Sequence, residues 1–121
     1  MEAGLPASGW RELVLWLLRR RCLLRVSGES MTPTLPAGAV VMIDPRAYHL
    51  RAPREDELVV ADHPRQADLR IVKRVAAVIE SQRGDVRLLL SSDNAAAGAD
   101  SRAFGSIATE SVLGKVTSRL R

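Results

Sequence analysis

Apolar residues are spaced differently in two parts of this chain, and the spacing predicts one helix followed by a series of strands. The uninterrupted apolar run of residues 13–18 predicts a helix over about residues 10–22, capped by Ser8 or Gly9. After it, short apolar runs are separated by turn-forming residues, which is typical of strands. The predicted strands are 23–26, 40–43, 58–61, 69–79, 86–90 and 112–117.

The turns and the length of the chain indicate one small domain. Gly84-Asp85 stands between two predicted strands and is a typical hairpin turn. The 121 residues, of which 46% are hydrophobic, are enough for a single core. We therefore expect a mainly β protein, in which residues 1–25 form a helix and an arm and residues 26–121 form the main domain.

The alternation of residues along the strand 69–79 singles out Lys73. Alternate side chains of an extended strand share a face, so Lys73 lies with Leu69, Ile71 and Val75. A lysine between apolar neighbours loses hydration, which disfavours its charged form and lowers its pKa. Only a neutral amine can accept a proton, so Lys73 is a candidate general base.

Ser30 is a candidate nucleophile. It lies between Gly28 and Pro33, where a helix is unfavourable and an exposed turn is favoured. Gly28 permits backbone angles that bring amide groups close to a bound carbonyl, which makes the Ser30 amide a candidate donor to an oxyanion. A neutral lysine could remove the proton of the serine hydroxyl. Taken singly, Ser30 and Lys73 could also belong to an ordinary turn and an ordinary strand.

Four segments, in order along the chain, resemble the sequence boxes of the type I signal peptidase family. Residues 27–35 (SGESMTPTL) are similar to its serine box, residues 72–75 (VKRV) to its lysine box and residues 56–60 (DELVV) to its Gly-Asp-hydrophobic-Val-Val strand. The fourth segment comprises Ser92, Asp93, Asn94, Asp100, Ser101, Arg102 and Gly105.

The resemblance implies a serine endopeptidase with a domain of coiled antiparallel sheets. In such an enzyme Ser30 would attack the scissile carbonyl, and Lys73 would take its proton and later activate water. The residues implied to support the site are Gly28, Met31, Asp93, Asn94, Asp100, Ser101 and Arg102.

Within this family, the likeness is greatest to the nickel-type superoxide dismutase maturation proteases. It rests on His63-Pro64 and on residues 68–74 (DLRIVKR), 93–101 (DNAAAGADS) and 112–116 (VLGKV). This resemblance implies that the partner is a precursor of a nickel-type superoxide dismutase, from which the N-terminal propeptide is removed. We expect no nucleic-acid partner.

The chain departs from the wider family at four positions. Gly28 stands where many signal peptidases have a serine whose hydroxyl helps to hold the oxyanion, so a side-chain donor is excluded there. Gly98 stands where the wider family has a serine that hydrogen-bonds the catalytic lysine, so another group must orient Lys73. Glu55 and Ser92 replace two usual glycines, and we expect these changes to affect turn geometry rather than chemistry.

Cysteine and histidine usage excludes several other kinds of site. The single cysteine, Cys22, cannot form an internal disulfide, and with His49 and His63 it supplies no metal-ligand spacing. We expect no metal or other cofactor. A triad of Ser30, His63 and a carboxylate is a formal alternative, but His63 precedes a proline in a predicted loop. The lone cysteine favours a reducing compartment, so we expect a cytoplasmic protein.

The N-terminal segment allows two interpretations. The net charge of +4 comes partly from the arginines at positions 19–21 and Arg25, which follow the apolar run 13–18. That run is much shorter than the roughly 20 residues that span a bilayer. We expect the helix to pack on the core or in a substrate groove, because a small domain needs that apolar area. Alternatively, residues 10–25 rest on an anionic membrane surface.

Three alternative functions remain open. A signal peptidase acting on exported or organelle precursors would use the N-terminal helix as a peripheral anchor. A self-cleaving regulator resembling the SOS repressor proteins would cut its own Ala3-Gly4 bond, although there is no room for a DNA-binding domain before Ser30 and residues 93–102 are foreign to that group. A binding module that retains the boxes without activity is the third, and the presence of both Ser30 and Lys73 argues against it.

Overall fold

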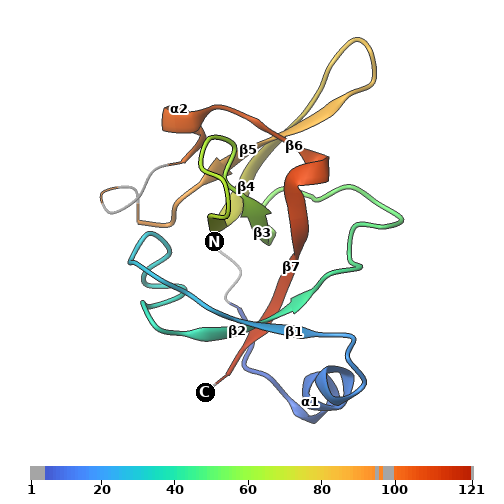
Figure 1. The fold of residues 1–121 in the computed structure, drawn as a ribbon, viewed down its shortest axis with the longest axis vertical. Coiled ribbons are helices and arrows are strands. Elements are labelled where there is room, and N and C mark those ends of the chain that lie inside the picture. The colour runs from blue at the N-terminus through green and yellow to red at the C-terminus, as the bar shows by residue number, and fades with distance from the viewer. Residues whose placement is uncertain (1–4, 95, 97–99, 121) are drawn as a thin grey trace.

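A single antiparallel sheet dominates the molecule (Figure 1). The computed structural model describes residues 5–94, 96 and 100–120. Their elements are α1 (Trp10–Leu17), β1 (Cys22–Arg25), β2 (Val40–Asp44), β3 (Leu58–Asp62), β4 (Arg70–Glu80), β5 (Val86–Ser91), α2 (Ser101–Phe104), β6 (Ile107–Ala108), the 3-10 helix η1 (Thr109–Ser111) and β7 (Val112–Arg119). The seven strands are ordered β1-β2-β7-β3-β4-β5-β6. The predicted mainly β fold is confirmed.

All six predicted strands are present, with ends displaced by no more than two residues. Gly84 has a φ of 85° in the turn between β4 and β5, where the Ser81 amide donates to the Asp85 carbonyl at 2.8 Å, which confirms the predicted hairpin. The pattern did not indicate β6 or α2, because two-residue and four-residue elements are too short to establish a period.

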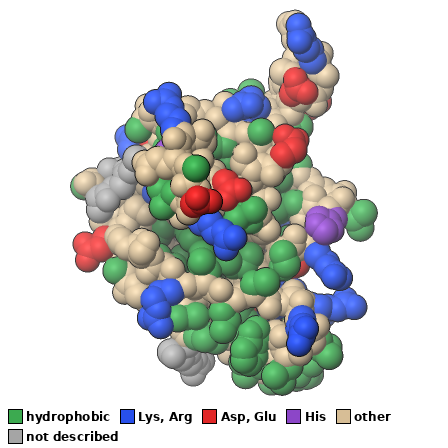
Figure 2. Space-filling model, in the orientation of Figure 1, with side chains coloured by type: hydrophobic (Ala, Val, Ile, Leu, Met, Phe, Trp, Pro, Cys, Tyr) green, Lys and Arg blue, Asp and Glu red, His purple; other side chains and the backbone are tan. Residues whose placement is uncertain are grey.

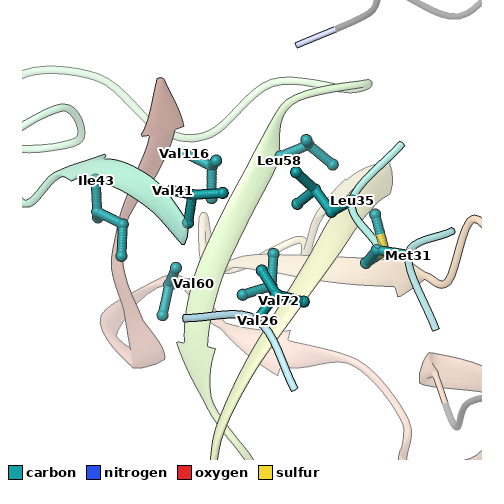
Figure 3. Packing of buried hydrophobic residues seen from close by; sticks show 9 residues of the cluster. All are labelled: Val26, Met31, Leu35, Val41, Ile43, Leu58, Val60, Val72 and Val116. Carbon is teal, nitrogen blue, oxygen red and sulfur yellow. The ribbon is translucent and has the colours of Figure 1, made fainter. Parts of the chain in front are cut away.

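The sheet is curled and packs apolar residues on both of its faces. In β3, Leu58 and Val60 belong to one buried cluster, whereas Val59 and Ala61 belong to another. The first cluster, drawn in Figure 3, comprises Val26, Met31, Leu35, Val41, Ile43, Leu58, Val60, Val72 and Val116. The expected single core is therefore divided in two by the sheet.

Gly114 of β7 is required because the neighbouring strand β2 lies very close to it. A Cβ atom at this position would lie 2.6 Å from Ile43 Cγ2 and 2.7 Å from the Asp44 carbonyl oxygen. A Cβ atom does not approach non-bonded atoms this closely, so a larger residue would push the two strands apart. The close approach also coincides with a bulge in the pairing, between Met42 and Ile43.

The predicted helix over residues 10–22 is wrong in its C-terminal part. α1 ends at Leu17, Arg19 has a φ of 61°, and Cys22 already begins β1. β1 pairs with β2, with Cys22 opposite Ile43. Cys22, which was predicted to end the helix, is therefore part of a strand. The arginines at 19–21 follow the helix rather than forming its last turn.

The expected packing of α1 on the core is also wrong. No residue of α1 is buried, and Trp10 and Leu17 are 78% and 71% exposed. The helix instead contacts the sheet through a polar side chain, since the Glu12 carboxylate accepts hydrogen bonds from the Thr117 hydroxyl and from Arg21 Nε. In Figure 1, α1 lies beside β1 and β2, at the far end of the molecule from the β4–β5 hairpin. No helix in the described part of the chain is long and apolar enough to cross a membrane.

Candidate active site

Lys73 lies in the middle of the sheet, as the strand pattern predicted. On β4 it stands opposite Val59 of β3, and only 5% of the residue is exposed. Ile71 and Val75 lie two residues away on each side and pack in the second apolar cluster. The buried residues of that cluster are Val59, Ala61, Val75, Leu88, Leu90, Phe104 and Ile107. Leu69 differs from the prediction, because it precedes β4 and is 39% exposed.

The environment of the Lys73 amine favours its neutral form. Burial lowers the pKa of Lys73 below its ordinary value, and the negative charge of Asp100 acts in the opposite direction. The amine donates a hydrogen bond of 2.9 Å to the hydroxyl of Ser92. Ser92 itself is 7% exposed. The predicted direction of the pKa shift is therefore found, together with a polar partner that the sequence analysis had not assigned.

Arg74 and Asp93 form a buried ion pair next to this lysine. Arg74 donates from Nε and Nη2 to the two carboxylate oxygens of Asp93, each at 2.9 Å, and from Nη1 to the Asp56 carbonyl oxygen at 2.8 Å. The Arg74 and Asp93 side chains are 7% and 3% exposed. Burial raises the pKa of Asp93, but hydrogen bonds from Arg74 and Thr34 outweigh it and lower that pKa overall. Asp93 is thereby held as an anion.

The segment that carries Ser30 is held in place by the packing of apolar side chains in the first cluster. Met31 is 1% exposed and packs in the first cluster with Val26 and with Val72 of β4, as Figure 3 shows. Gly28 has a φ of 76°, a conformation that favours glycine. The chain therefore turns at Gly28 and presents Ser30 next to a buried neighbour.

Asp93 and Asn94 hold the same segment from its other side. The Asn94 amide donates to the Ser30 carbonyl oxygen at 2.7 Å, and Asn94 Nδ2 donates to the Thr32 hydroxyl at 3.0 Å. The Thr34 hydroxyl donates to Asp93 Oδ2 at 2.6 Å. Both residues, which were expected to support the site, thus brace the Ser30 segment against the end of β5.

The remaining predicted supporting residues form a second brace around α2. Asp100 is 5% exposed, caps α2 by accepting from the Arg102 amide, and pairs with the Arg102 guanidinium at 3.1 Å. This Arg102 hydrogen bond is the main reason that the pKa of Asp100 is lowered. The Ser101 hydroxyl accepts a hydrogen bond of 2.7 Å from the Leu90 amide and so ties α2 to β5. Gly98 and the Ala3-Gly4 bond lie outside the described residues.

Ser30 and Lys73 line one pocket of about 140 Å³. Its wall is formed by the segment from Leu24 to Ser27 on one side and by residues 69–73 on the other. Within residues 5–94, 96 and 100–120, no hydrogen bond joins the Ser30 hydroxyl to the Lys73 amine, and the Ser30 amide has no acceptor. An unpaired amide beside a serine hydroxyl suits the predicted oxyanion donor.

His63 does not line this pocket, although its amide donates to the carbonyl oxygen of Leu69 in the pocket wall at 2.8 Å. Its Nδ1 accepts hydrogen bonds from the amides of Arg65 and Gln66, and its ring packs on Phe104 with the centroids 5.0 Å apart. It lines a different pocket, to which Ser30 does not contribute. The alternative triad of Ser30, His63 and a carboxylate is therefore not assembled.

Ser92 and Arg74 are the site residues that sequence reasoning missed. Ser92, in place of a usual glycine, was expected to affect turn geometry only, but its hydroxyl also accepts a hydrogen bond from the Lys73 amine. Arg74 was named only as part of the lysine box, residues 72–75, without a role of its own. A signal for both lay in the β4–β5 hairpin, because antiparallel pairing brings residues 73–74 next to residues 91–93.

Comparison with known proteins adds one finding. The family model described as signal peptidase, peptidase S26, matches residues 13–79, which is more than half of the 121 residues and includes Ser30 and Lys73. No curated protein matches the chain.

Proposed function

Since the chain belongs to the signal peptidase family, peptidase S26, we propose that it is a serine endopeptidase in which Ser30 is the nucleophile and Lys73 the general base. One observation carries this proposal: a nearly completely buried lysine lines the same pocket as a serine on a braced turn. Burial lowers the pKa of Lys73, which increases the fraction of amine able to accept a proton.

In the proposed mechanism, neutral Lys73 takes the hydroxyl proton of Ser30 as the oxygen attacks the scissile carbonyl. The Ser30 amide donates to the oxyanion of the tetrahedral intermediate. Lys73 then gives its proton to the leaving amine and activates the water that releases the acyl group. Catalytic hydrogen bonds often form only with substrate present, so we propose that substrate binding brings the Ser30 hydroxyl onto the amine.

Substitution of Lys73 tests this base directly. Lys73→Arg retains a positive charge but removes the ability to accept a proton, so we expect a loss of activity of about 10³-fold or more. In the native protein kcat should rise with pH through the pKa of Lys73, which burial places below that of an exposed lysine. An arginine variant with native kcat would eliminate Lys73 as the base.

For the substrate, we propose the N-terminal propeptide of a nickel-type superoxide dismutase precursor, on the resemblance of residues 68–74 and 93–101 to the maturation proteases of that enzyme. The test is intact mass spectrometry of such a precursor coexpressed with the native chain, Ser30→Ala or Lys73→Ala. Loss of a short N-terminal peptide only with the native chain is the expected result. An uncut precursor, with another peptide substrate cut in a Ser30-dependent way, would overturn the substrate and leave the mechanism standing.

A second candidate is a signal peptidase that works at a membrane surface, with α1 as a peripheral contact. The exposed apolar side of α1 favours it: Trp10, Leu17 and Leu18 are each more than 60% exposed, and the exposed Arg19 and Arg20 follow them. In Figure 2, green hydrophobic side chains gather at the end of the molecule where α1 lies, with basic side chains beside them. This arrangement suits an anionic lipid surface. The first candidate instead implies a cytoplasmic protein that needs no lipid.

Co-sedimentation with anionic vesicles separates the two candidates. If α1 binds the surface, Leu17→Ser should reduce binding, whereas Leu50→Ser should not, because Leu50 is fully exposed in a loop elsewhere in the chain. Equal binding of both variants and of the native chain, or no binding of any of them, would contradict the membrane candidate.

A further inference from the structure

We propose that Ser92 is the positioning residue of Lys73: its hydroxyl holds the lysine amine in the orientation from which the amine serves Ser30. The inference rests on the proposed serine peptidase mechanism. It starts from the hydrogen bond of 2.9 Å between Lys73 Nζ and Ser92 Oγ, in which both residues are less than 10% exposed.

A bulge in β4 decides which residue meets the lysine. The pairing of β4 with β5 shifts by one residue between Val75 and Ala77. Between the shift and the hairpin turn, Ala77 lies opposite Leu89. On the other side of the shift, Val75 lies opposite Leu90. Ala76 is therefore the extra residue, and every pair beyond it is displaced by one position.

This displacement places a hydroxyl, rather than a second carboxylate beside that of Asp100, next to the lysine. Arg74 lies opposite Ser91, so the next pair in the same register is Lys73 with Ser92. The regular register of the hairpin, continued without the bulge, would instead have brought Asp93 opposite Lys73. A carboxylate there would stabilise the ammonium form and weaken the base. Asp93 is bound by Arg74 instead.

A neutral hydroxyl is suited to orienting an amine without keeping it charged. A neutral lysine amine has two N–H donors and one lone pair. Donation of one N–H to Ser92 restricts rotation about the terminal carbon–nitrogen bond, which leaves the lone pair for the Ser30 proton. Ser92 is itself well fixed, because it lies between β5 and Asp93, whose side chain is held by two hydrogen bonds from Arg74.

The chain offers an unusually direct readout, because Lys73 and Lys115 are its only lysines. NMR titration of the two ¹³Cε signals would follow both amines in the full chain. Ser92→Ala removes an acceptor of the Lys73 ammonium, so the Lys73 midpoint should move to lower pH. The signal of Lys115, whose amine pairs with Glu57 at 3.2 Å, serves as the internal reference.

Kinetics then test the role in catalysis. Ser92→Ala should lower kcat about tenfold, as expected for one lost hydrogen bond, with KM unchanged and the acidic limb of the pH–kcat profile moved to lower pH. Ser91→Ala, at the neighbouring position of β5, is the matched control. It should change neither the acidic limb of the pH–kcat profile nor the titration midpoint of Lys73. Ser92→Thr restores a hydroxyl and should recover part of kcat.

Two results would overturn the inference, and they differ from failure of the proposed function. If the titration midpoint of Lys73 is the same in Ser92→Ala as in the native chain, the hydroxyl does not act on the amine, whether or not any peptide is cut. If Ser92→Ala cleaves at the native rate or faster, the bond does not serve catalysis. A native chain that cuts no substrate while the Lys73 midpoint shifts in Ser92→Ala would contradict the peptidase and, with it, the catalytic role of Ser92.

Discussion

In β4, Lys73 and Arg74 are 5% and 6% exposed, whereas α1 has no buried residue and leaves Trp10 and Leu17 in solvent. Both segments combine apolar residues with cations, so composition does not separate them. β4 is hydrogen-bonded to β3 on one side and to β5 on the other, and apolar clusters cover both faces of this part of the sheet. α1 contacts the sheet through Glu12, whose carboxylate accepts a hydrogen bond from Thr117 of β7.

In this protein a cation is buried where the sheet already fixes a partner group for it. Arg74 meets the Asp93 carboxylate and Lys73 meets the Ser92 hydroxyl, and both partners are placed by the β4–β5 pairing. At α1, the Thr117 hydroxyl donates a hydrogen bond to the Glu12 carboxylate, while Trp10 and Leu17 of the helix remain exposed. Paired polar groups, rather than hydrophobicity alone, thus set the orientation of both segments.

The largest expected difference between the two segments concerns their arginines. Arg74→Ala leaves the Asp93 charge buried without its partner and should reduce the free energy of unfolding by about 4 kcal/mol. Arg20→Ala, the same change at an exposed position after α1, should cost less than about 0.5 kcal/mol. Urea denaturation of both variants measures the two values. Similar losses would contradict the contrast between a buried pair and a solvated cation.

A smaller difference is expected for a matched pair of valines. Val75 of β4 is fully buried and Val14 of α1 is 43% exposed. Val75→Ala removes buried methyl groups and leaves a cavity, which should cost about 2 kcal/mol. Val14→Ala should change stability by no more than about 0.5 kcal/mol, since alanine is also the better helix former. If Val14→Ala costs as much as Val75→Ala, α1 packs on the protein in solution.

The smallest expected effect is a gain in stability on removing the proposed base. The pKa of Lys73 is lower in the folded chain than in the unfolded chain, so between these two values the unfolded state binds more protons and stability rises with pH. Lys73→Met should remove this penalty and stabilise the fold by about 1 kcal/mol below the folded-state pKa. The gain should vanish above the pKa of the unfolded chain.

Thermal and urea unfolding across this pH range check the effect on Lys73. The control is Lys115→Met, because Lys115 is 35% exposed and paired with Glu57, and its replacement should give no gain. A Lys73→Met variant that is less stable than the native chain at neutral pH would mean that the amine contributes more through its bond to Ser92 than burial costs.

Local patterns in the sequence were enough to predict the strands, the β4–β5 hairpin and the burial of Lys73. Each depends on a local rule: alternation puts Lys73 between Ile71 and Val75, and Gly84 supplies a turn. The candidate pair of Ser30 and Lys73, and the supporting residues Asp93 and Asn94, also followed from short motifs in the sequence.

The group that contacts the Lys73 amine and the side of α1 that is exposed to solvent depend on contacts between distant segments of the chain. The bulge at Ala76 moves the pairing by one residue and brings Ser92, rather than Asp93, to Lys73. Likewise, the contact of Glu12 with Thr117 joins residues far apart in the chain, and the helix that it holds leaves Trp10 and Leu17 exposed. A local period cannot specify either feature, because a register shift or a helix orientation is chosen by interactions between segments that meet only when the sheet has formed.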